Sequence, residues 1–232
     1  MPLDPKDIES LALLDEPARR ALYEWVSAQT DAVGRDDAAK AVGISRALAA
    51  FHLDRLARDG LLETEYRRLT GRTGPGAGRP AKLYRRTARD IEVSLPARRY
   101  EAAARVMADA LERSGDVVPP PAVRESAHEA GVAIGTAART TLGPRPSRRR
   151  RHAALLEALA SRGYEPREAT AGLIVLGNCP YHALVEDHQE LVCGMNLALA
   201  DGVLEGLGTK DAHAVLDPEP GRCCVLIRED GA

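Results

Sequence analysis

Aromatic residues are scarce in this chain: they make up 3% of its 232 residues, and Trp25 and Phe51 are each the sole example of their kind. The core must therefore be aliphatic, and an aromatic platform for stacking single-stranded bases is disfavoured. Long hydrophobic runs are also missing, because no stretch approaches the ~18 apolar residues of a membrane span. The first residues lack a basic-then-apolar signal pattern. We therefore expect a cytoplasmic protein with no membrane partner.

The chain also lacks an overall charge of one sign, since its formal net charge is -2. Hydrophobic residues (44%) and charged residues (28%) are close to globular averages, which disfavours disorder. Locally the balance differs: between Gly43 and Arg89, eleven Lys or Arg stand against four acids, a net charge of +7. Such a basic segment is typical of a surface that neutralises phosphates, and the alternative is a solvated basic face.

Hydrophobic periodicity divides the chain into helices and strands. Helical patterns occupy residues 5–14, 16–29, 36–42, 46–59, 96–114, 121–141, 150–162 and 181–207. Strand patterns occupy residues 61–69, 81–87, 169–176, 212–216 and 223–228. Residues 70–80 hold four glycines and two prolines, which predicts the loop of a hairpin between the first two strands.

The order of the first elements is that of a winged helix-turn-helix. In its turn, Gly43 supplies backbone freedom, Ile44 can fill the small core between the helices, and Ser45 can cap the next helix. That helix is expected to turn Leu48, Leu53 and Leu56 inward. Its other face would then meet base edges in double-stranded DNA.

Arg46 is the long donor on that outer face, and it could pair with guanine O6 and N7. Small neighbours would allow close approach or contact with thymine methyls, whereas His52 is expected to be a packing residue. A hairpin with charged edges and no DNA role is the alternative for the wing. The candidate DNA-binding residues are Ser45, Arg46, Ala47, Ala50, Phe51, Arg55, Arg67, Arg68, Arg72, Arg79 and Lys82.

The four cysteines, Cys179, Cys193, Cys223 and Cys224, lie in different predicted elements of the C-terminal half. Thiolates suit zinc or iron–sulfur clusters, and a cytoplasmic location disfavours structural disulfides. Only Cys179 and His182 are spaced like a ligand knuckle, so the pattern is not that of a zinc ribbon. The alternative is four free cysteines that act as small buried hydrophobes.

Several segments resemble a known family. AVGISRALAAFHLDRLARDGLLETEYRR and GRPAKLYRRT resemble bacterial repressors of the ArsR-like superfamily, in particular its SufR-like, iron–sulfur-sensing branch. NCPYHALVEDHQELVCGMNLALADGVL and GRCCVLI resemble the cysteine-bearing half of that branch. The resemblance implies a 4Fe–4S or 2Fe–2S iron–sulfur cluster, with Cys179, Cys193 and one of Cys223 and Cys224 as ligands.

The fourth ligand stays open among the second vicinal cysteine, His182 and His188. Consecutive strand residues point to opposite faces, so only one of Cys223 and Cys224 is expected to face the cluster.

We therefore expect an α+β, mainly helical protein in three parts. These are a winged helix-turn-helix domain (1–92), a helical dimerisation segment (93–145) and an α+β sensory domain with the cysteines (146–232). A homodimer would place two recognition helices about one DNA turn apart on a palindromic operator.

The expected function is that of a transcriptional regulator, not an enzyme. One alternative is a winged-helix regulator whose C-terminal domain is zinc-stabilised or binds a small molecule. Another is an enzyme or ligand-binding protein that uses the winged helix to dock proteins. We find no nucleophile elbow, phosphate loop or dinucleotide fingerprint in its favour.

Overall fold

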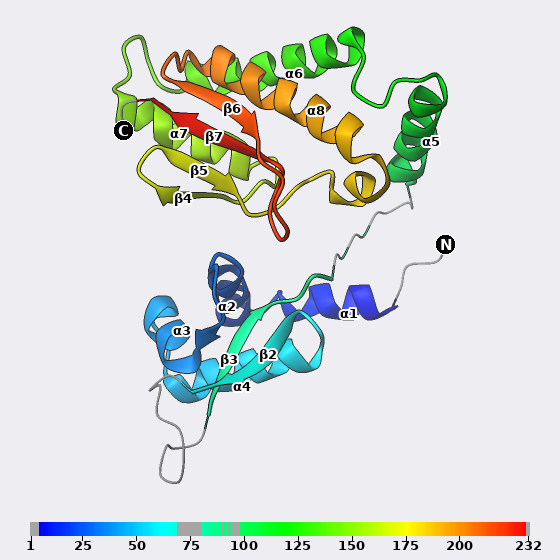
Figure 1. The fold of residues 1–232 in the computed structure, drawn as a ribbon. Helices are drawn as coiled ribbons and strands as arrows, with labels where there is room; N and C mark the ends of the chain where they lie inside the picture. The colour runs from blue at the N-terminus through cyan, green and yellow to red at the C-terminus, as the bar shows by residue number, and fades with distance from the viewer. Residues whose placement is uncertain (1–4, 69–79, 90, 92, 94–97, 231–232) are drawn as a thin grey trace. The chain divides into compact units, whose positions relative to one another are not determined.

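The computed structural model describes residues 5–68, 80–89, 91, 93 and 98–230, and the chain forms two compact units, Met1–Arg98 and Arg99–Ala232. Each unit combines helices with one antiparallel sheet, so the expected α+β class is confirmed (Figure 1). Residues 98–145 do not form a unit of their own, because their helices pack within the second unit. Among the described helices, none combines the length and apolar character needed to cross a membrane.

In its described residues, the first unit contains four helices and a three-stranded sheet. Its elements are α1 (Pro5–Leu13), α2 (Pro17–Ser27), β1 (Val33–Gly34), α3 (Arg35–Val42), α4 (Arg46–Arg58), β2 (Leu62–Arg67) and β3 (Ala81–Arg86). The strand order is β1-β3-β2. Strand β1 was not expected from the sequence, because two residues show no periodicity; it is defined by pairing of Val33 with Tyr84.

The inward face of α4 differs from the expected one at a single position. Ala49, His52, Leu53 and Leu56 are buried, whereas Leu48 is 41% exposed, so the prediction that Leu48 turns inward is wrong. Residues 49, 52, 53 and 56 follow the i, i+3, i+4, i+7 spacing of one helix face, and Leu48 lies outside that stripe. The burial of His52 agrees with the packing role predicted for it.

The second unit contains four helices and a four-stranded sheet. Its elements are α5 (Tyr100–Arg113), α6 (Pro121–Thr140), α7 (Arg148–Ala160), β4 (Pro166–Thr170), β5 (Leu173–Leu176), α8 (His182–Leu207), β6 (Ala212–Leu216) and β7 (Val225–Glu229). The strand order is β4-β5-β7-β6, antiparallel throughout. Residues 169–176, predicted as one strand, are instead two, because the chain turns at Gly172, whose φ of +74° favours glycine.

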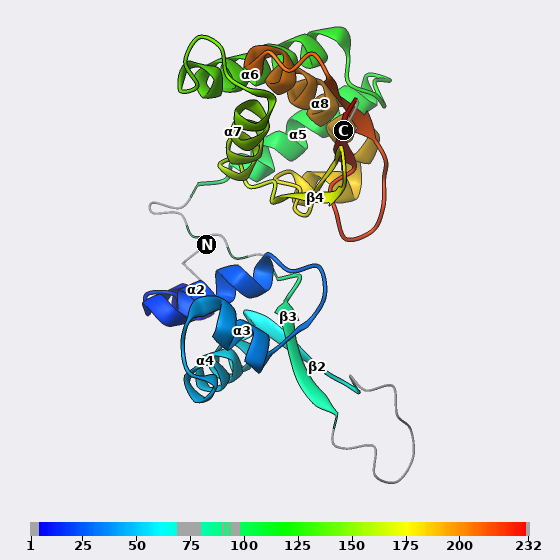
Figure 2. The same ribbon diagram turned by 90° about the vertical axis from the view of Figure 1, so that its left-hand side faces the viewer.

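Helices α6 and α8 lie side by side with their backbones in close approach (Figures 1 and 2). Four glycines line the contact: Gly131 and Gly135 on α6, Gly202 and Gly206 on α8. A Cβ added at Gly131 would lie 2.1 Å from the carbonyl oxygen of Leu199, and one at Gly202 would lie 2.1 Å from that of His128. Only glycine permits this contact, so the small-residue face of α6 is used within the chain.

The core of the second unit lies between the sheet and two helices. Leu155 and Leu159 of α7, and Val203 and Leu207 of α8, pack in one cluster with side chains of β5 and β7. The cluster includes the buried Cys223 and borders Cys179. The position of α8 on the sheet therefore decides what surrounds the cysteines.

We predict that Gly202→Ala destabilises the protein by about 1–3 kcal/mol or more, because its methyl group would meet the backbone of α6. Urea unfolding followed by circular dichroism measures the change. Ala133→Ser is the matched control, since it adds one atom to an exposed position of α6 and should leave the midpoint nearly unchanged. Equal midpoints for Gly202→Ala and the wild type would contradict the close contact.

Candidate functional site

The first candidate site is built on the turn between α3 and α4. Gly43 ends α3 with a φ of +73°, and its N–H donates to the carbonyl of Ala39. Ile44 packs against the core, as predicted. Ser45 caps α4, because its Oγ accepts a hydrogen bond from the N–H of Leu48 at 3.2 Å. The turn therefore fixes where α4 begins and which side chains its first turn exposes.

The exposed face of the first two turns of α4 carries one long cation among apolar side chains. Arg46, Ala47 and Phe51 are exposed, the last by 64%, and Ala50 is half-buried. Leu48, which was predicted to lie in the core, is exposed as well and adds to this apolar surface. The Nε of Arg46 lies 2.5 Å from Oδ1 of Asp36 on α3. Both side chains are mostly exposed, so this pair contributes little stability and leaves Arg46 able to exchange partners.

Asp54, on α4, accepts hydrogen bonds from three side chains of other elements. The Nζ of Lys82 on β3 lies 2.6 Å from Oδ1, and the hydroxyl of Tyr84 donates to the same oxygen at 2.7 Å. Arg35, the first residue of α3, donates to both carboxylate oxygens and, through Nε, to the hydroxyl of Tyr84. These contacts join α3, α4 and β3 at one carboxylate.

Electrostatics reinforces this junction. Burial alone would raise the pKa of Asp54, but the hydrogen bonds of Lys82 and Tyr84 and the charge of Arg35 together lower it. Burial, followed by the hydrogen bond to Asp54, raises the pKa of Tyr84 to about 12. Lys82, predicted to contact DNA, is thus engaged in holding the hairpin strand against α4.

The other predicted cations of the first unit lie on the α4 end and the hairpin. Arg55 pairs with Asp59 at 2.7 Å, Arg67 lies 3.6 Å from Glu65, and Arg68 is exposed. Arg72 and Arg79 lie outside the described residues. Apart from Lys82, the described cations of this group are surface side chains that neighbouring acids balance in part.

The second candidate site is a group of four cysteines that three segments bring together. Cys179 follows β5, Cys193 lies on α8, and Cys223 and Cys224 directly precede β7. The thiols form two neighbouring pairs, Cys179 with Cys223 and Cys193 with Cys224, and within each pair one thiol shifts the pKa of its neighbour. Cys193 and Cys223 are buried, whereas Cys179 and Cys224 are half-buried, so each pair joins an interior thiol to one nearer the surface.

The argument that only one of Cys223 and Cys224 faces a cluster rested on a strand at both positions. That premise is wrong, because β7 begins at Val225 and strand alternation does not apply to the two cysteines; which of them would face a cluster stays a prediction. Their backbones bond in opposite directions: the N–H of Cys223 donates to Leu176, and the carbonyl of Cys224 accepts from Asp217. The thiol of Cys223 neighbours that of Cys179, and the thiol of Cys224 neighbours that of Cys193.

The pKa values of the thiols differ because of these contacts. The hydrogen bond with Cys223, together with burial, raises the pKa of Cys179, whereas the same bond lowers the pKa of Cys223 to about 7 against the effect of burial. Asn196 and Arg222 also lower the pKa of Cys223. Burial, followed by the hydrogen bond with Cys224, raises the pKa of Cys193 to about 12. The thiolate, which is the ligand and nucleophile, is therefore favoured at Cys223.

Two amide side chains of α8 face the cysteines and were not singled out from the sequence. Asn196 Nδ2 lies 3.4 Å from the sulfur of Cys223, and its Oδ1 accepts a 2.6 Å hydrogen bond from the hydroxyl of Tyr164. Gln189 Nε2 lies 3.9 Å from the sulfur of Cys224. One signal in the sequence could have pointed to Asn196, because it is a polar residue in the otherwise apolar run Met195–Ala200. In the structure it is 1% exposed, and a buried amide needs hydrogen-bond partners.

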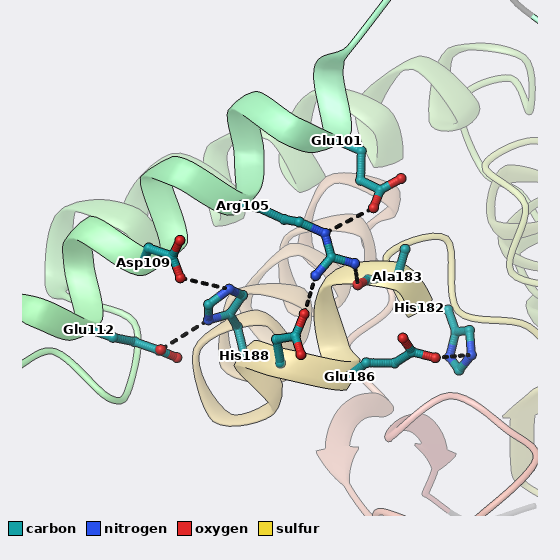
Figure 3. A network of polar contacts seen from close by, with 9 residues as sticks. Glu101, Arg105, Asp109, Glu112, His182, Ala183, Glu186 and His188 are labelled. Atoms are coloured by element: carbon teal, nitrogen blue, oxygen red, sulfur yellow. Dashed lines mark hydrogen bonds and ion pairs between the residues drawn. The ribbon is translucent and has the colours of Figure 1, made fainter. Parts of the chain in front are cut away.

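The two histidines considered as ligands have other partners. His182 is largely exposed, with Nε2 3.7 Å from Glu186, and the buried His188 has Nδ1 3.0 Å from Glu112 (Figure 3). Within residues 5–68, 80–89, 91, 93 and 98–230, no three His, Cys, Asp or Glu side chains are arranged ready to hold a metal ion. The cysteines thus suit a thiophilic metal by donor type, but in the described residues they are grouped in two pairs and not as a set of three or more ligands.

No protein-family model matches the chain, and no curated protein or solved structure matches it significantly.

Proposed function

We propose that this protein is a cytoplasmic, DNA-binding transcriptional regulator, a repressor of the ArsR-like winged-helix class. Its operator affinity would be controlled by an iron–sulfur cluster on Cys179, Cys193, Cys223 and Cys224, as in the SufR-like branch that its sequence resembles. The observation that carries the DNA-binding part is the first turn of α4, capped by Ser45 and exposing Arg46, Ala47 and Phe51. Such a face, next to a two-stranded hairpin, suits the major groove of a duplex.

The contacts around α4 assign different roles to its charged residues. Arg46 would leave its exposed partner Asp36 and read guanine, since an exposed ion pair is worth at most about 1 kcal/mol. Lys82 and Asp54 would act indirectly, by fixing the hairpin strand relative to α4. Arg67 and Arg68 would contact phosphates.

We predict that Arg46→Ala weakens binding to a specific duplex by about 1–3 kcal/mol and relaxes discrimination at one base pair. Arg72→Ala or Arg79→Ala should lower affinity for all sequences and flatten its salt dependence. Fluorescence anisotropy at several salt concentrations measures both effects. Arg20→Ala removes the same charge from an exposed position of α2 and serves as control.

Asp36→Asn should keep or increase affinity, because it removes an acid that competes for Arg46. Equal affinity of the wild type and the three arginine variants would refute this interface.

A homodimer is part of the proposal, and α5 is the helix best suited to form it. The glycine face of α6 is already covered by α8. On α5, Tyr100, Val106 and Met107 are exposed, and with Ala103 and Ala110 they form an uncharged stripe along one side. Such a stripe is self-complementary about a two-fold axis, so a second copy of the chain suits it.

We predict that the wild type sediments as a dimer and that Met107→Glu sediments as a monomer with weaker operator binding, because only one half-site is then held. Thr136→Glu places the same charge on an exposed position of α6 and should leave the dimer intact. Analytical ultracentrifugation with and without DNA provides the measurement. Only monomer in both conditions for the wild type would contradict the proposal.

The sensory part is supported by four thiols that come from three segments and lie in two neighbouring pairs. When bound, an iron–sulfur cluster would supply chemistry that responds to oxidants and iron supply. The side chains of α8 would position the ligands: Asn196 orients the sulfur of Cys223, and Gln189 orients that of Cys224. A change in the arrangement of the three segments that alters DNA affinity by a few kcal/mol would suffice to switch operator occupancy.

We predict that anaerobic reconstitution with iron and sulfide gives visible charge-transfer absorption that zinc cannot produce. Cys179→Ser and Cys193→Ser should each abolish it, since each removes a ligand from a separate segment. Cys223→Ser and Cys224→Ser should lower this absorption to different extents, with the larger loss of absorption for the buried Cys223. His182→Ala is the control and should retain the cluster.

Iron and sulfide analysis, with circular dichroism of each variant, completes this experiment. Iron content unaffected by Cys179→Ser, or one zinc ion per chain and no iron, would refute the cluster. The zinc-stabilised regulator would then replace it.

A further inference from the structure

The first two turns of α4 present few hydrogen-bonding side chains to a ligand. Residues 46–52 read RALAAFH, and Arg46 is the one residue among them whose side chain is both polar and exposed. The other polar residue, His52, is 5% exposed. The exposed surface of these two turns is therefore apolar apart from a single guanidinium.

Ala47, Leu48 and Phe51 form this apolar surface, which we call the α4 patch. Leu48 is 41% exposed and Phe51 is 64% exposed. Phe51 follows Ala47 by four positions and Leu48 by three, so the three side chains are neighbours on one side of the helix. The single phenylalanine of the chain thus lies on the surface, outside both hydrophobic cores.

The ring of Phe51 rests against a side chain that is itself held in place. Its centroid lies 5.3 Å from that of His52, with the two planes inclined at 66°, which is the edge-to-face geometry that aromatic pairs favour. Nε2 of His52 lies 3.4 Å from Glu16, and the carboxylate of Glu16 accepts hydrogen bonds from two N–H groups at the start of α2. The protein therefore positions the exposed ring before any ligand binds.

The surroundings of the α4 patch favour a polyanion as its partner. Arg55 and Arg58 are exposed and follow Phe51 at i+4 and i+7, on the same side of the helix. The segment between Gly43 and Arg89 carries a net charge of +7. Three apolar side chains are also far fewer than the ~20–30 residues a side of a stable protein interface. A DNA duplex offers phosphates to the cations and methyl groups to the apolar side chains.

The side chains of α4 restrict which bases the helix can read directly. Asn and Gln, which pair with adenine, do not occur in Arg46–Arg58. The acid that could accept from cytosine, Asp54, is held by Lys82 and Tyr84. Apolar side chains contact the 5-methyl group of thymine, which the major groove exposes. Beyond the guanine contact of Arg46, direct discrimination by α4 would therefore depend on thymine methyl groups.

We propose that the α4 patch reads thymine methyl groups in the major groove, beside the guanine that Arg46 contacts. This inference rests on the proposed DNA binding by α4. Each half-site of the operator then combines a guanine with neighbouring thymines. Leu48 and Phe51 determine specificity at the thymines, because their methyl contacts are lost with adenine, guanine or unmodified cytosine. Burial of one methyl group against apolar side chains strengthens binding about fourfold.

The test replaces thymidine by deoxyuridine, which forms the same base pair and lacks only the 5-methyl group. The full chain first selects a site from a library of random duplexes, and the selected duplex is the probe. We expect its half-sites to contain thymine beside guanine. In fluorescence anisotropy, each deoxyuridine at a contacted position should weaken binding by the wild type about fourfold.

Phe51→Ala and Leu48→Ala should each bind the thymidine duplex more weakly than the wild type and respond less to deoxyuridine. Both side chains are exposed, and circular dichroism checks that each variant folds, so either variant suffices for the test. Leu11→Ala is the matched control, because Leu11 on α1 is also 41% exposed, and it should behave as the wild type. Arg46→Ala should weaken binding and keep the response to deoxyuridine, because its guanidinium does not contact the methyl group.

Two kinds of failure are distinguishable. A selected site without thymine, equal affinity of the wild type for both duplexes, or an undiminished deoxyuridine response in both patch variants would overturn the thymine contacts. DNA binding would then stand, and the α4 patch would be left for a protein partner. Selection of no specific duplex by the wild type would instead refute the proposed DNA binding, and this inference with it.

Discussion

The close approach of α6 and α8 is the contact on which the second unit depends. With Gly131 and Gly135 facing Gly202 and Gly206, the two backbones come into direct contact, and a Cβ at any of the four glycines would collide with the other helix. The same helix packs Val203, Leu204 and Leu207 against the sheet. Once α8 is fixed in this way, Cys193 and Asn196 must face the segment before β7, where Cys223 and Cys224 lie. The arrangement of the thiols therefore follows from helix packing.

Polar contacts, rather than apolar packing, connect elements at three places. Asp54 joins α3, α4 and β3, Asn196 links Tyr164 to Cys223, and Arg105 joins α5 to α8 (Figure 3). Partly buried hydrogen bonds and ion pairs are directional, so they specify relative orientation better than aliphatic contacts do. Removing one partner of such a contact also costs more stability, because the other polar group is then left without a hydrogen bond. Changes at such residues should alter geometry before they unfold a unit.

Most elements could be predicted from the sequence because their signals are local. Hydrophobic spacing located the main helices, and Ser45 marked the start of α4. The predictions were wrong where contacts between residues distant in the sequence determine burial or strand pairing. Leu48 is exposed because the core selects the stripe of Ala49, Leu53 and Leu56, and β1 exists only through its pairing with β3. Residues 169–176 read as a continuous apolar stretch, although Gly172 turns the chain back between two strands.

By itself, the sequence determined the α+β class, the capped helix after Gly43, and the presence of four thiols with no other strong ligand pattern near them. These features depend on residue type and short-range spacing, which a chain carries before it folds. Only the tertiary structure decided that the two vicinal cysteines neighbour different thiols, that Asp54 engages Lys82, and that Arg105 of α5 meets Asp187 of α8. Each of these contacts joins residues at least 28 positions apart, and their meeting is set by helix packing and strand pairing.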